Sequence, residues 1–410
     1  MTHPATFAQL DPPSRLLMGA GPTNVHPRIL RAMSYDVIGQ MDPEMTAYMD
    51  EVMALYREVF RTKNHWTLLV NGSARSAIEA ALVSLVSPGM KVVIPRFGRF
   101  GLLLTEIVHR CGGIPCTVDV EWGQVVAPAA IEAAIIEHKP GLVACVHGDT
   151  STTTAQPLEE IGRICRKHDV LFYVDATATL GGMTFETDAW NIDVATAGLQ
   201  KCLNGPPGSA PITLSERAVA AILKRRHDEA GIATGQPQGD GPVIQSNYFD
   251  LAMLMNYWSP ARMNHHTEAT SMLYAARETA RLVVEEGVEA RVARHVRAGR
   301  AMVAGLRAMG LKVYGDDATR MSNVTGVWVP DGVDNARIRQ LMRDDFGIEI
   351  VSSFGPLTGK IWRIGAMGIN ARKDKVLLTL AALDSVLAGE GVKLNRGAGV
   401  DAARAAWDAA

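Results

Sequence analysis

The sequence is short of several features that would assign a protein to a class quickly. Only five of its 410 residues are cysteine, and an odd number without metal-type spacing builds neither a disulfide framework nor a zinc site. No apolar run approaches the ~18 residues that span a bilayer, and the first residues lack the basic and apolar regions of a secretory signal. The formal net charge is −2, which provides no basic surface for nucleic acid or an anionic membrane. These absences predict a reduced, cytoplasmic protein.

Two further absences exclude specific kinds of site. No Gly-x-Gly-x-x-Gly follows the first expected strand, which argues against a nicotinamide-dependent dehydrogenase. The adjacent His265 and His266 suggest a metal site, but neighbouring residues do not face the same way in regular structure and no cluster of Cys or carboxylates completes a site. We therefore expect no metal. Thr267, the next residue, suits a helix N-cap.

The composition is that of an ordinary globular protein, with 47% hydrophobic and 20% charged residues, and the length suffices for two domains. Apolar runs predict strands at Trp66–Val70, Lys91–Arg96, Ile114–Val120, Leu142–His147, Leu171–Asp175, Val194–Ala197 and Ala210–Leu214. Helical periodicity between them predicts helices at Arg75–Leu85, Phe100–Arg110, Pro128–His138, Leu158–His168 and Glu216–Asp228. Repeated strand–helix–strand units predict an α/β fold with a mostly parallel sheet.

The pattern changes after about residue 230, where a Gly/Pro-rich loop precedes a long expected helix at 268–286. A second, smaller α/β block follows, with strands expected at 323–329, 348–353 and 361–366 and helices at 288–309, 334–345 and 372–388. We therefore predict four parts: an irregular N-terminal arm (1–25), a large domain (26–287), a small C-terminal domain (288–390) and a tail (391–410) with a short Ala-rich helix.

A lysine and an aspartate carry the main chemical signal. Lys201 follows a short apolar run and precedes a Gly/Pro-rich turn, where a lysine can form a Schiff base with an aldehyde cofactor. Asp175 ends an expected strand, and open α/β sheets place their sites at the carboxyl ends of strands. A buried carboxylate there needs a partner, which a protonated pyridine nitrogen supplies. The alternative is that Asp175 only caps the turn that follows.

Other candidate residues follow strands of the same predicted sheet. The turn 71–76 opens a helix, so its free N–H groups, with Ser73 and Arg75, form a candidate anion site. Thr150 lies in a polar cluster after the fourth strand, and its hydroxyl can form a hydrogen bond with a phenolic oxygen of a cofactor. Phe100 follows the second strand and can stack on a flat ring. Each also has a purely structural explanation: the turn 71–76 joins a strand to a helix, Thr150 belongs to a polar loop, and Phe100 packs in the core.

Arg363 lies inside the apolar strand expected at 361–366. A charge in such a strand is costly unless it is paired. Bidentate binding of a substrate carboxylate explains this arginine, and a buried structural ion pair explains it equally well.

These residues occur in the order and spacing of the class V aminotransferases of fold type I, a family that the chain resembles over roughly residues 15–390. The resemblance implies pyridoxal 5'-phosphate as cofactor, with Lys201 as the Schiff-base lysine and Asp175 at the pyridine nitrogen. It implies that Phe100 replaces the family's usual stacking Trp and that Arg363 takes the substrate carboxylate.

The same resemblance implies residues at the cofactor phosphate and a shared site. Ser73, Ala74, Arg75 and Gln200 correspond to positions that border the phosphate. The segment that includes Thr267 corresponds to one that crosses the interface of a homodimer and reaches the partner's phosphate. Cysteine desulfurases are a neighbouring class, but the loop 352–360 has no Cys, and Gln200 stands where those enzymes usually have His.

Two positions concern the amino donor. Asn264 stands where alanine–glyoxylate enzymes carry Tyr, and Gln40 is a second amide. Amides donate and accept hydrogen bonds, which suits a ureido group better than a methyl or hydroxymethyl group. In this the chain resembles the (S)-ureidoglycine–glyoxylate transaminases of bacterial purine catabolism, which implies that oxalurate and glycine are the products. Alanine–glyoxylate, serine–glyoxylate and pyridoxamine–pyruvate transamination stay open, as does a role of both amides in supporting loops.

Overall fold

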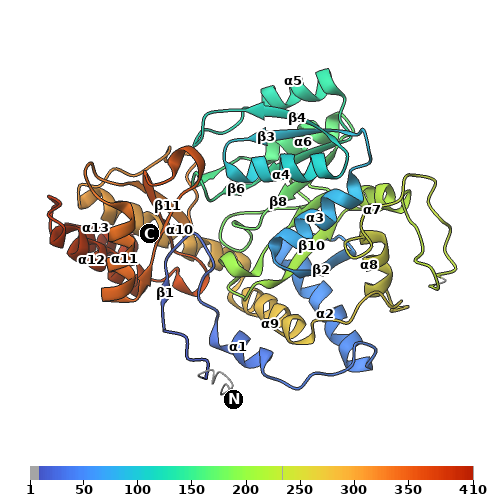
Figure 1. The fold of residues 1–410 in the computed structure, drawn as a ribbon, viewed down its shortest axis with the longest axis horizontal. Helices are drawn as coiled ribbons and strands as arrows, with labels where there is room; N and C mark the ends of the chain where they lie inside the picture. Colours follow the sequence, from blue (N-terminus) through green and yellow to red (C-terminus); the bar gives the residue numbers. More distant parts are fainter. Residues whose placement is uncertain (1–8, 233, 410) are drawn as a thin grey trace, which may run out of the picture.

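The computed structural model describes residues 9–232 and 234–409 (Figure 1). Its centre is a seven-stranded sheet in the order β2-β10-β9-β8-β5-β3-β4. Only β10 is antiparallel to its neighbours, β2 and β9. The strands are β2 (Trp66–Gly72), β3 (Lys91–Arg96), β4 (Ile114–Asp119), β5 (Leu142–Val146), β8 (Leu171–Asp175), β9 (Val194–Thr196) and β10 (Gly208–Leu214). The predicted α/β fold with a mostly parallel sheet is confirmed.

Helices cover this sheet because its central strands are apolar on both faces. All five residues of β5 are buried, which is the pattern of a strand packed between two layers. The covering helices include α3 (Ala74–Leu85), α4 (Arg99–Arg110), α5 (Pro128–His138), α6 (Glu159–Lys167) and α7 (Glu216–Leu223). The prediction that α7 continues to Asp228 is wrong, because Gly239 and Gly241 donate to the carbonyls of Arg226 and Lys224 and fold the chain back.

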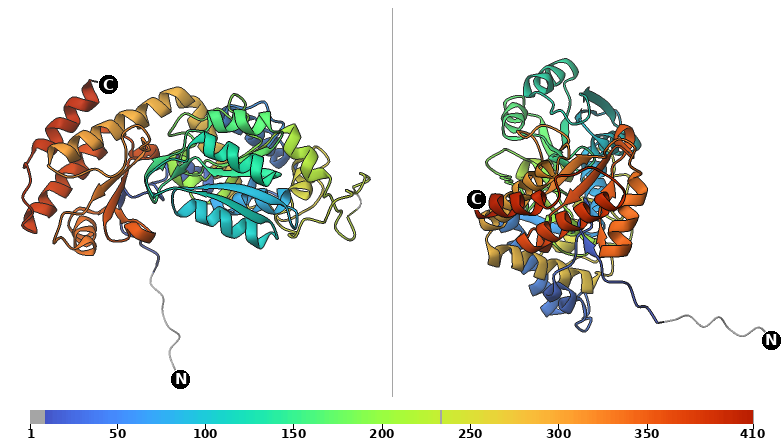
Figure 2. Two further views of the ribbon diagram at one scale, coloured as in Figure 1. Left: turned by 90° about the horizontal axis from the view of Figure 1, so that it is seen from above. Right: turned by 90° about the vertical axis from the view of Figure 1, so that its left-hand side faces the viewer.

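A three-stranded antiparallel sheet, β11-β14-β13, lies in the second block. Its strands are β11 (Val324–Trp328), β13 (Val351–Ser352) and β14 (Ile361–Gly365), and its helices are α10 (Val288–Ala308), α11 (Asn335–Phe346), α12 (Lys373–Gly389) and α13 (Ala398–Asp408). Figure 2 (left) shows the long helix α10 running from beside the seven-stranded sheet across the second block. The boundaries at residues 25, 287 and 390 stay predictions.

The N-terminal arm contains a strand that the sequence did not indicate. β1 (Leu16–Leu17) pairs in parallel with β12 (Ile348–Glu349), so the arm joins the second block and the predicted strand 348–353 is split in two. Residues 1–8 of the predicted arm lie outside the described residues. A second short pair, β6 (Gly148–Asp149) with β7 (Thr154–Ala155), shapes the loop after β5.

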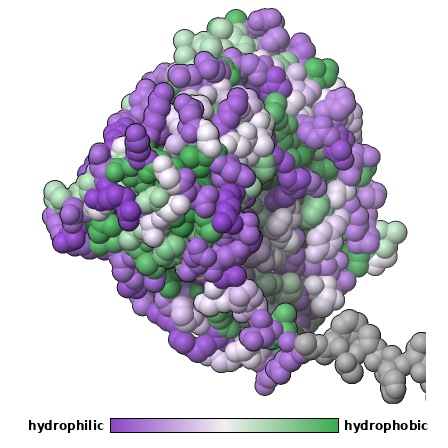
Figure 3. Space-filling model, turned by 60° about the vertical axis from the view of Figure 1, so that its left-hand side comes forward, coloured by the Kyte–Doolittle hydropathy of each residue, from purple (hydrophilic) through white to green (hydrophobic). Residues whose placement is uncertain are grey.

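Helices α1 (Pro27–Met33), α2 (Pro43–Phe60), α8 (Leu251–Trp258) and α9 (Thr270–Glu286) complete the fold. Helix α9 has Ala269 as its N-cap, so the prediction that Thr267 caps a helix is wrong. Within the ranges 9–232 and 234–409, none of the helices has both the length and the apolar character needed to cross a membrane. On the face in Figure 3, hydrophilic and hydrophobic residues are interspersed.

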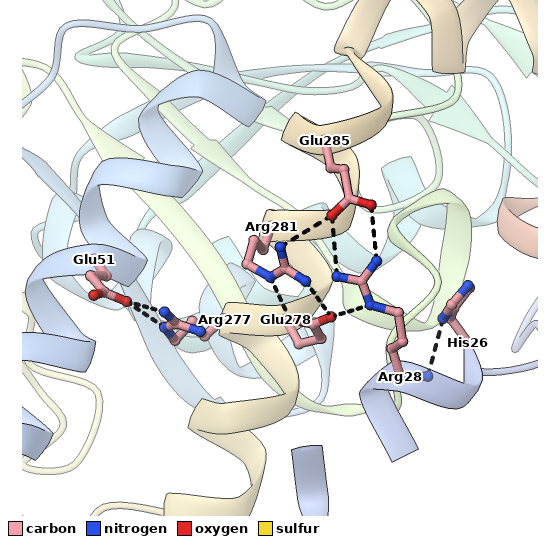
Figure 4. Close-up of polar contacts among 7 residues, drawn as sticks. All are labelled: His26, Arg28, Glu51, Arg277, Glu278, Arg281 and Glu285. Atoms are coloured by element: carbon pink, nitrogen blue, oxygen red, sulfur yellow. Dashed lines mark hydrogen bonds and ion pairs between the residues drawn. The ribbon is translucent and has the colours of Figure 1, made fainter. Parts of the chain in front are cut away.

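A network of partly exposed ion pairs joins α1 to α9 (Figure 4). Arg28 of α1 donates to Glu278 at 2.8 Å and to Glu285 at 2.9 Å. Arg281 binds the same two glutamates along α9, at 2.8 and 3.1 Å. Exposed pairs of this kind each contribute about 0–1 kcal/mol, so the network orients the helices more than it stabilises them.

Candidate active site

A partly open cavity of about 220 Å³ lies at the carboxyl ends of β2, β5 and β8. This is the edge where open α/β sheets hold their ligands. Eight predicted site residues from five separate segments line it: Ser73, Ala74, Arg75, Phe100, Thr150, Asp175, Gln200 and Lys201. The structure therefore brings these eight residues together around one cavity, while their roles stay predictions.

Lys201 lies in a π-helical turn, Leu199–Leu203, that departs from helical geometry at the lysine itself (φ −111°, ψ −130°). Its Nζ donates to the carbonyl of Ala20 in the N-terminal arm. Gly21 lies so close that a Cβ there would overlap the lysine side chain, and its φ of +100° also requires glycine. Burial, and next the charge of Arg363, lower the pKa of Lys201 to about 8. With this pKa half of the amine is deprotonated at about pH 8, so far more free base is present near neutral pH than for an ordinary lysine.

Asp175 ends β8 on the wall of the same cavity and is buried. Its Oδ1 accepts a hydrogen bond from the backbone N–H of Thr177 at 2.9 Å. Burial raises the pKa of Asp175, although the hydrogen bond from the Thr177 backbone N–H and the charge of Lys201 oppose the shift. An additional cationic donor in the cavity would complete the stabilisation of this carboxylate.

The start of α3 is suited to an anion. Ser73 is the N-cap but makes no side-chain capping bond, which leaves its hydroxyl free for a ligand. Two buried polar atoms on the cavity wall, Gln200 Oε1 and Thr177 Oγ1, have no hydrogen-bond partner among the described residues. A side chain at Gly198 would strike Ala74 and Gln200, so the glycine keeps this part of the wall open.

Asp149 is a positioning residue that sequence analysis missed. It is fully buried, and its carboxylate accepts from the backbone N–H groups of Phe100 and Ser151 at 2.8 and 2.9 Å. A Cβ at Gly98 would overlap Asp149, so the loop before α4 closes directly onto this carboxylate. Asp149 thereby fixes the Phe100 backbone at the cavity wall. The sequence offered one indication of this role, because Asp149 follows the strand expected at Leu142–His147.

Arg363 is buried in β14 and donates to backbone carbonyls: Nη1 to Thr150 at 2.9 Å, and Nε and Nη2 to Ser352 at 2.8 and 2.6 Å. The negative charge of the buried Asp149 also favours the charged form of Arg363, so both explanations of this arginine stay open. Three of its five N–H groups are used, so one on each terminal nitrogen remains. The ring of Phe354 lies 4.8 Å from the guanidinium, and burial lowers the pKa of Arg363 to about 10.

Gln40, Asn264 and Thr267 do not line the cavity of their own chain. Gln40 donates to Asn264 Oδ1 at 2.9 Å and accepts from the Glu268 backbone N–H at 3.1 Å. Asn264 and Thr267 are exposed. The structure therefore brings the two predicted donor-recognition amides together, but not beside Lys201.

The expectation that the adjacent His265 and His266 side chains do not face the same way is wrong. The imidazoles of His265 and His266 do face one another, with their Nδ1 atoms 2.8 Å apart. His266 Nε2 lies 2.7 Å from Asn71 Nδ2, at the end of β2. Burial lowers the pKa of His266 to about 4, so it is neutral at physiological pH.

The sheet order and the lysine-bearing cavity are those of a fold-type I, pyridoxal-phosphate-dependent transferase. Within that class the chain belongs to the aminotransferase class-V family, whose model matches residues 16–362.

The chain is similar to individual members of this family to different degrees. The chain is 49% identical to the (S)-ureidoglycine–glyoxylate transaminase of Bacillus subtilis (strain 168), over 97% of this chain and 95% of the relative. The crystal structure of the ureidoglycine–glyoxylate aminotransferase from Bacillus subtilis superimposes with a TM-score of 0.92 at 47% identity, covering 98% of this chain and all of the other. The alanine–glyoxylate aminotransferase of Callithrix jacchus is 34% identical, over 93% of this chain and 90% of the relative.

Proposed function

We propose that this protein is a pyridoxal-phosphate-dependent transaminase that moves the amino group of (S)-ureidoglycine to glyoxylate, giving oxalurate and glycine in purine catabolism. The observation that supports the reaction type is that the Lys201 and Asp175 side chains line the same cavity. The similarity to the Bacillus subtilis transaminase, which exceeds that to an alanine–glyoxylate enzyme, supports the amino donor.

The cavity fits pyridoxal phosphate by the chemistry of its walls. The unpartnered Gln200 Oε1 needs a hydrogen-bond donor, while the Ser73 hydroxyl at the start of α3 and the amide N–H groups of Gln200 can donate to an anionic group of the cofactor. In this proposal Ser73, Ala74, Arg75 and Gln200 hold the phosphate. Phe100 covers the ring, and Thr150 meets the phenolic oxygen.

Lys201 and Asp175 perform the central steps. Pyridoxal phosphate, when bound, supplies an electron sink that stabilises negative charge at the donor's Cα. Asp175 keeps the ring nitrogen protonated, because a buried carboxylate favours a cation beside it. Lys201, with a pKa of about 8, would take the donor's Cα proton on Nζ in the first half-reaction, and Nζ would deliver a proton to the reacting carbon of glyoxylate in the second.

Arg363 orients both substrates by the group they share. Ureidoglycine and glyoxylate each carry a carboxylate next to the reacting carbon. The two N–H groups of Arg363 that remain point from different terminal nitrogens and form the fork that a carboxylate accepts in bidentate fashion. The ring of Phe354 and the carbonyls of Thr150 and Ser352 fix the plane of that fork.

We further propose that the enzyme is a homodimer in which Gln40, Asn264 and Thr267 serve the partner's cavity. Large apolar side chains at Leu30, Tyr35, Val37 and Met41 are more than half exposed in the single chain, and they flank Gln40. A second chain that covers this surface would bring the amide pair to the other active site.

All five cysteines are free, which supports a cytoplasmic location.

The amide pair has the right polarity for a ureido carbonyl. Asn264 Oδ1 accepts from Gln40, and Gln40 Oε1 accepts from the Glu268 backbone N–H. Both amide oxygens are therefore used, whereas the N–H groups of Asn264 remain. Those groups are donors, and a ureido carbonyl is an acceptor.

A donor screen tests the proposal. The purified protein is expected to be yellow, and borohydride should fix the cofactor on Lys201. With glyoxylate as acceptor, ureidoglycine should exceed alanine and serine in kcat/KM by at least tenfold. A preference for alanine or serine, or for pyridoxamine with pyruvate, would replace the donor while leaving the transaminase class intact. Mixing Lys201→Ala with Asn264→Tyr chains should restore activity in hybrid dimers if the sites are shared.

A further inference from the structure

The backbone that carries Lys201 is not held by a regular hydrogen-bond ladder. The lysine interrupts its own π-helical turn, and Asn204, which ends the turn, has a left-handed conformation with φ of +73°. The carbonyls of Cys202 and Leu203 therefore need partners from elsewhere, since buried carbonyls without them are costly.

Arg291 of α10 supplies those partners. Its Nη2 donates to the Cys202 carbonyl at 2.7 Å, with a longer contact of 3.4 Å to the Leu203 carbonyl. Its Nη1 pairs with Glu286 at 2.6 Å. The side chain is buried, so this pairing is what makes a guanidinium tolerable at the site. Burial opposes ionisation of Glu286, but the bond from Arg294 and the charges of Arg291 and Arg294 lower its pKa.

The same carboxylate connects the Lys201 turn to the strand of Arg363. Arg294, one turn further along α10, binds Glu286 at 2.6 Å and donates to the carbonyls of Gly368 and Ala371 at 2.7 and 3.0 Å. Gly368 follows β14, the strand that contains Arg363. One cluster, the buried Arg291 with the partly exposed Glu286 and Arg294, thus contacts the turns that follow both residues.

We infer that Arg291, anchored by Glu286, is a positioning residue for Lys201: its grip on the Cys202 and Leu203 carbonyls sets where the lysine amine stands relative to Arg363. This inference rests on the proposed function only in treating Lys201 as the reactive amine. It concerns neither the amino donor nor the dimer. Arg291 touches no substrate and acts through the backbone.

A merely structural role would also make Arg291 variants less stable, so stability does not decide the matter. The pKa of Lys201 distinguishes a positioning role of Arg291 from a structural one. Its pKa is low because the amine is buried and lies near Arg363. A loosened turn admits water and lets the amine move from Arg363, so the pKa should rise toward the ordinary value.

The decisive variant is Arg291→Lys, which keeps the charge beside Glu286 but lacks the planar fork that reaches a carboxylate and a carbonyl together. The control is Arg281→Lys, which alters an arginine with two glutamate partners in α9 whose hydrogen bonds do not involve the Lys201 turn (Figure 4). The pH dependence of Lys201 labelling by an amine reagent, located by mass spectrometry, is measured on the full chain freed of cofactor. Thermal midpoints are recorded in parallel.

We expect the midpoint of Lys201 labelling to rise by about one pH unit in Arg291→Lys, equivalent to ~1.4 kcal/mol, and to stay unchanged in Arg281→Lys. A lower thermal midpoint with an unchanged labelling midpoint would overturn the inference. If Arg291→Lys does not fold, Glu286→Gln is tested in its place. We then expect a smaller upward shift of the Lys201 labelling midpoint, and an unchanged midpoint would overturn the inference. Labelling does not depend on the donor, so a failed ureidoglycine assay leaves this test intact.

Discussion

The strand-end cavity and the Gln40–Asn264 pair show two ways in which one chain builds a site. At the edge of the central sheet Asp175 is buried and Lys201 is partly buried, and backbone geometry fixes both within a single chain. Gln40 and Asn264 lie on loops near the surface and contact each other rather than the cavity. The residues that line the cavity come from one chain, whereas the proposed role of the amide pair requires a partner surface. Our proposal therefore assigns the chemistry to the sheet and the choice of donor to the loops.

Replacing Lys201 should give the largest effect and tests the buried half of the comparison. Lys201→Ala should abolish multiple turnovers, because no other amine lines the cavity among the described residues. Folding should be kept, since the change removes a buried cation. Rate assays with thermal unfolding as control decide this. Repeated turnover without added amine would contradict the role of Lys201.

Asp175→Asn should lower kcat by several powers of ten, at ~1.4 kcal/mol for each tenfold step. An amide cannot hold a ring nitrogen in its cationic form as a carboxylate does. The charge of Asp175 also raises the pKa of Lys201, so this variant should move the Lys201 labelling midpoint to lower pH. The Thr177 N–H can bond an amide oxygen equally well, so stability should change little. A near-normal rate would mean that Asp175 only caps its turn.

The same contrast separates what the sequence reveals from what it does not. The strands and their helices were predictable because continuous apolar runs and helical periodicity report burial directly, and Asp175 and Lys201 follow such runs. The role of Asp149 depends on a loop from another segment closing onto it, which no local pattern encodes. The Ala20 contact of Lys201 likewise joins residues that are far apart in the chain.

Arg363→Lys should raise KM for glyoxylate and for the donor alike, by roughly ten- to a hundredfold. Lysine cannot offer two N–H groups in one plane while also binding the carbonyls of Thr150 and Ser352. One lost charge-assisted hydrogen bond is worth about 1.5–3 kcal/mol. Steady-state kinetics with both substrates measure the effect. An unchanged KM for both would move the carboxylate site elsewhere.

The most selective expected effect, and the sharpest test of the proposed role of the loops, concerns Asn264. Asn264→Tyr should lower kcat/KM for ureidoglycine by about ten- to a hundredfold, because each lost hydrogen bond to a buried polar group costs on the order of 1–3 kcal/mol. Activity with alanine or serine should fall much less, or rise. Parallel kinetics with the three donors measure the difference.

Asn264→Asp is the matched variant that distinguishes recognition from support. Its carboxylate still accepts the bond that Gln40 donates, so the loop contact is kept, but the donors of the Asn264 amide are lost. If those donors bind the ureido carbonyl, Asn264→Asp should lose ureidoglycine activity selectively, as Asn264→Tyr does. If the pair only supports the loops, Asn264→Asp should behave as the unaltered enzyme with every donor, and Asn264→Tyr should impair all donors equally. The second pattern would end the assignment of donor choice to this pair, while the buried half of the comparison would stand.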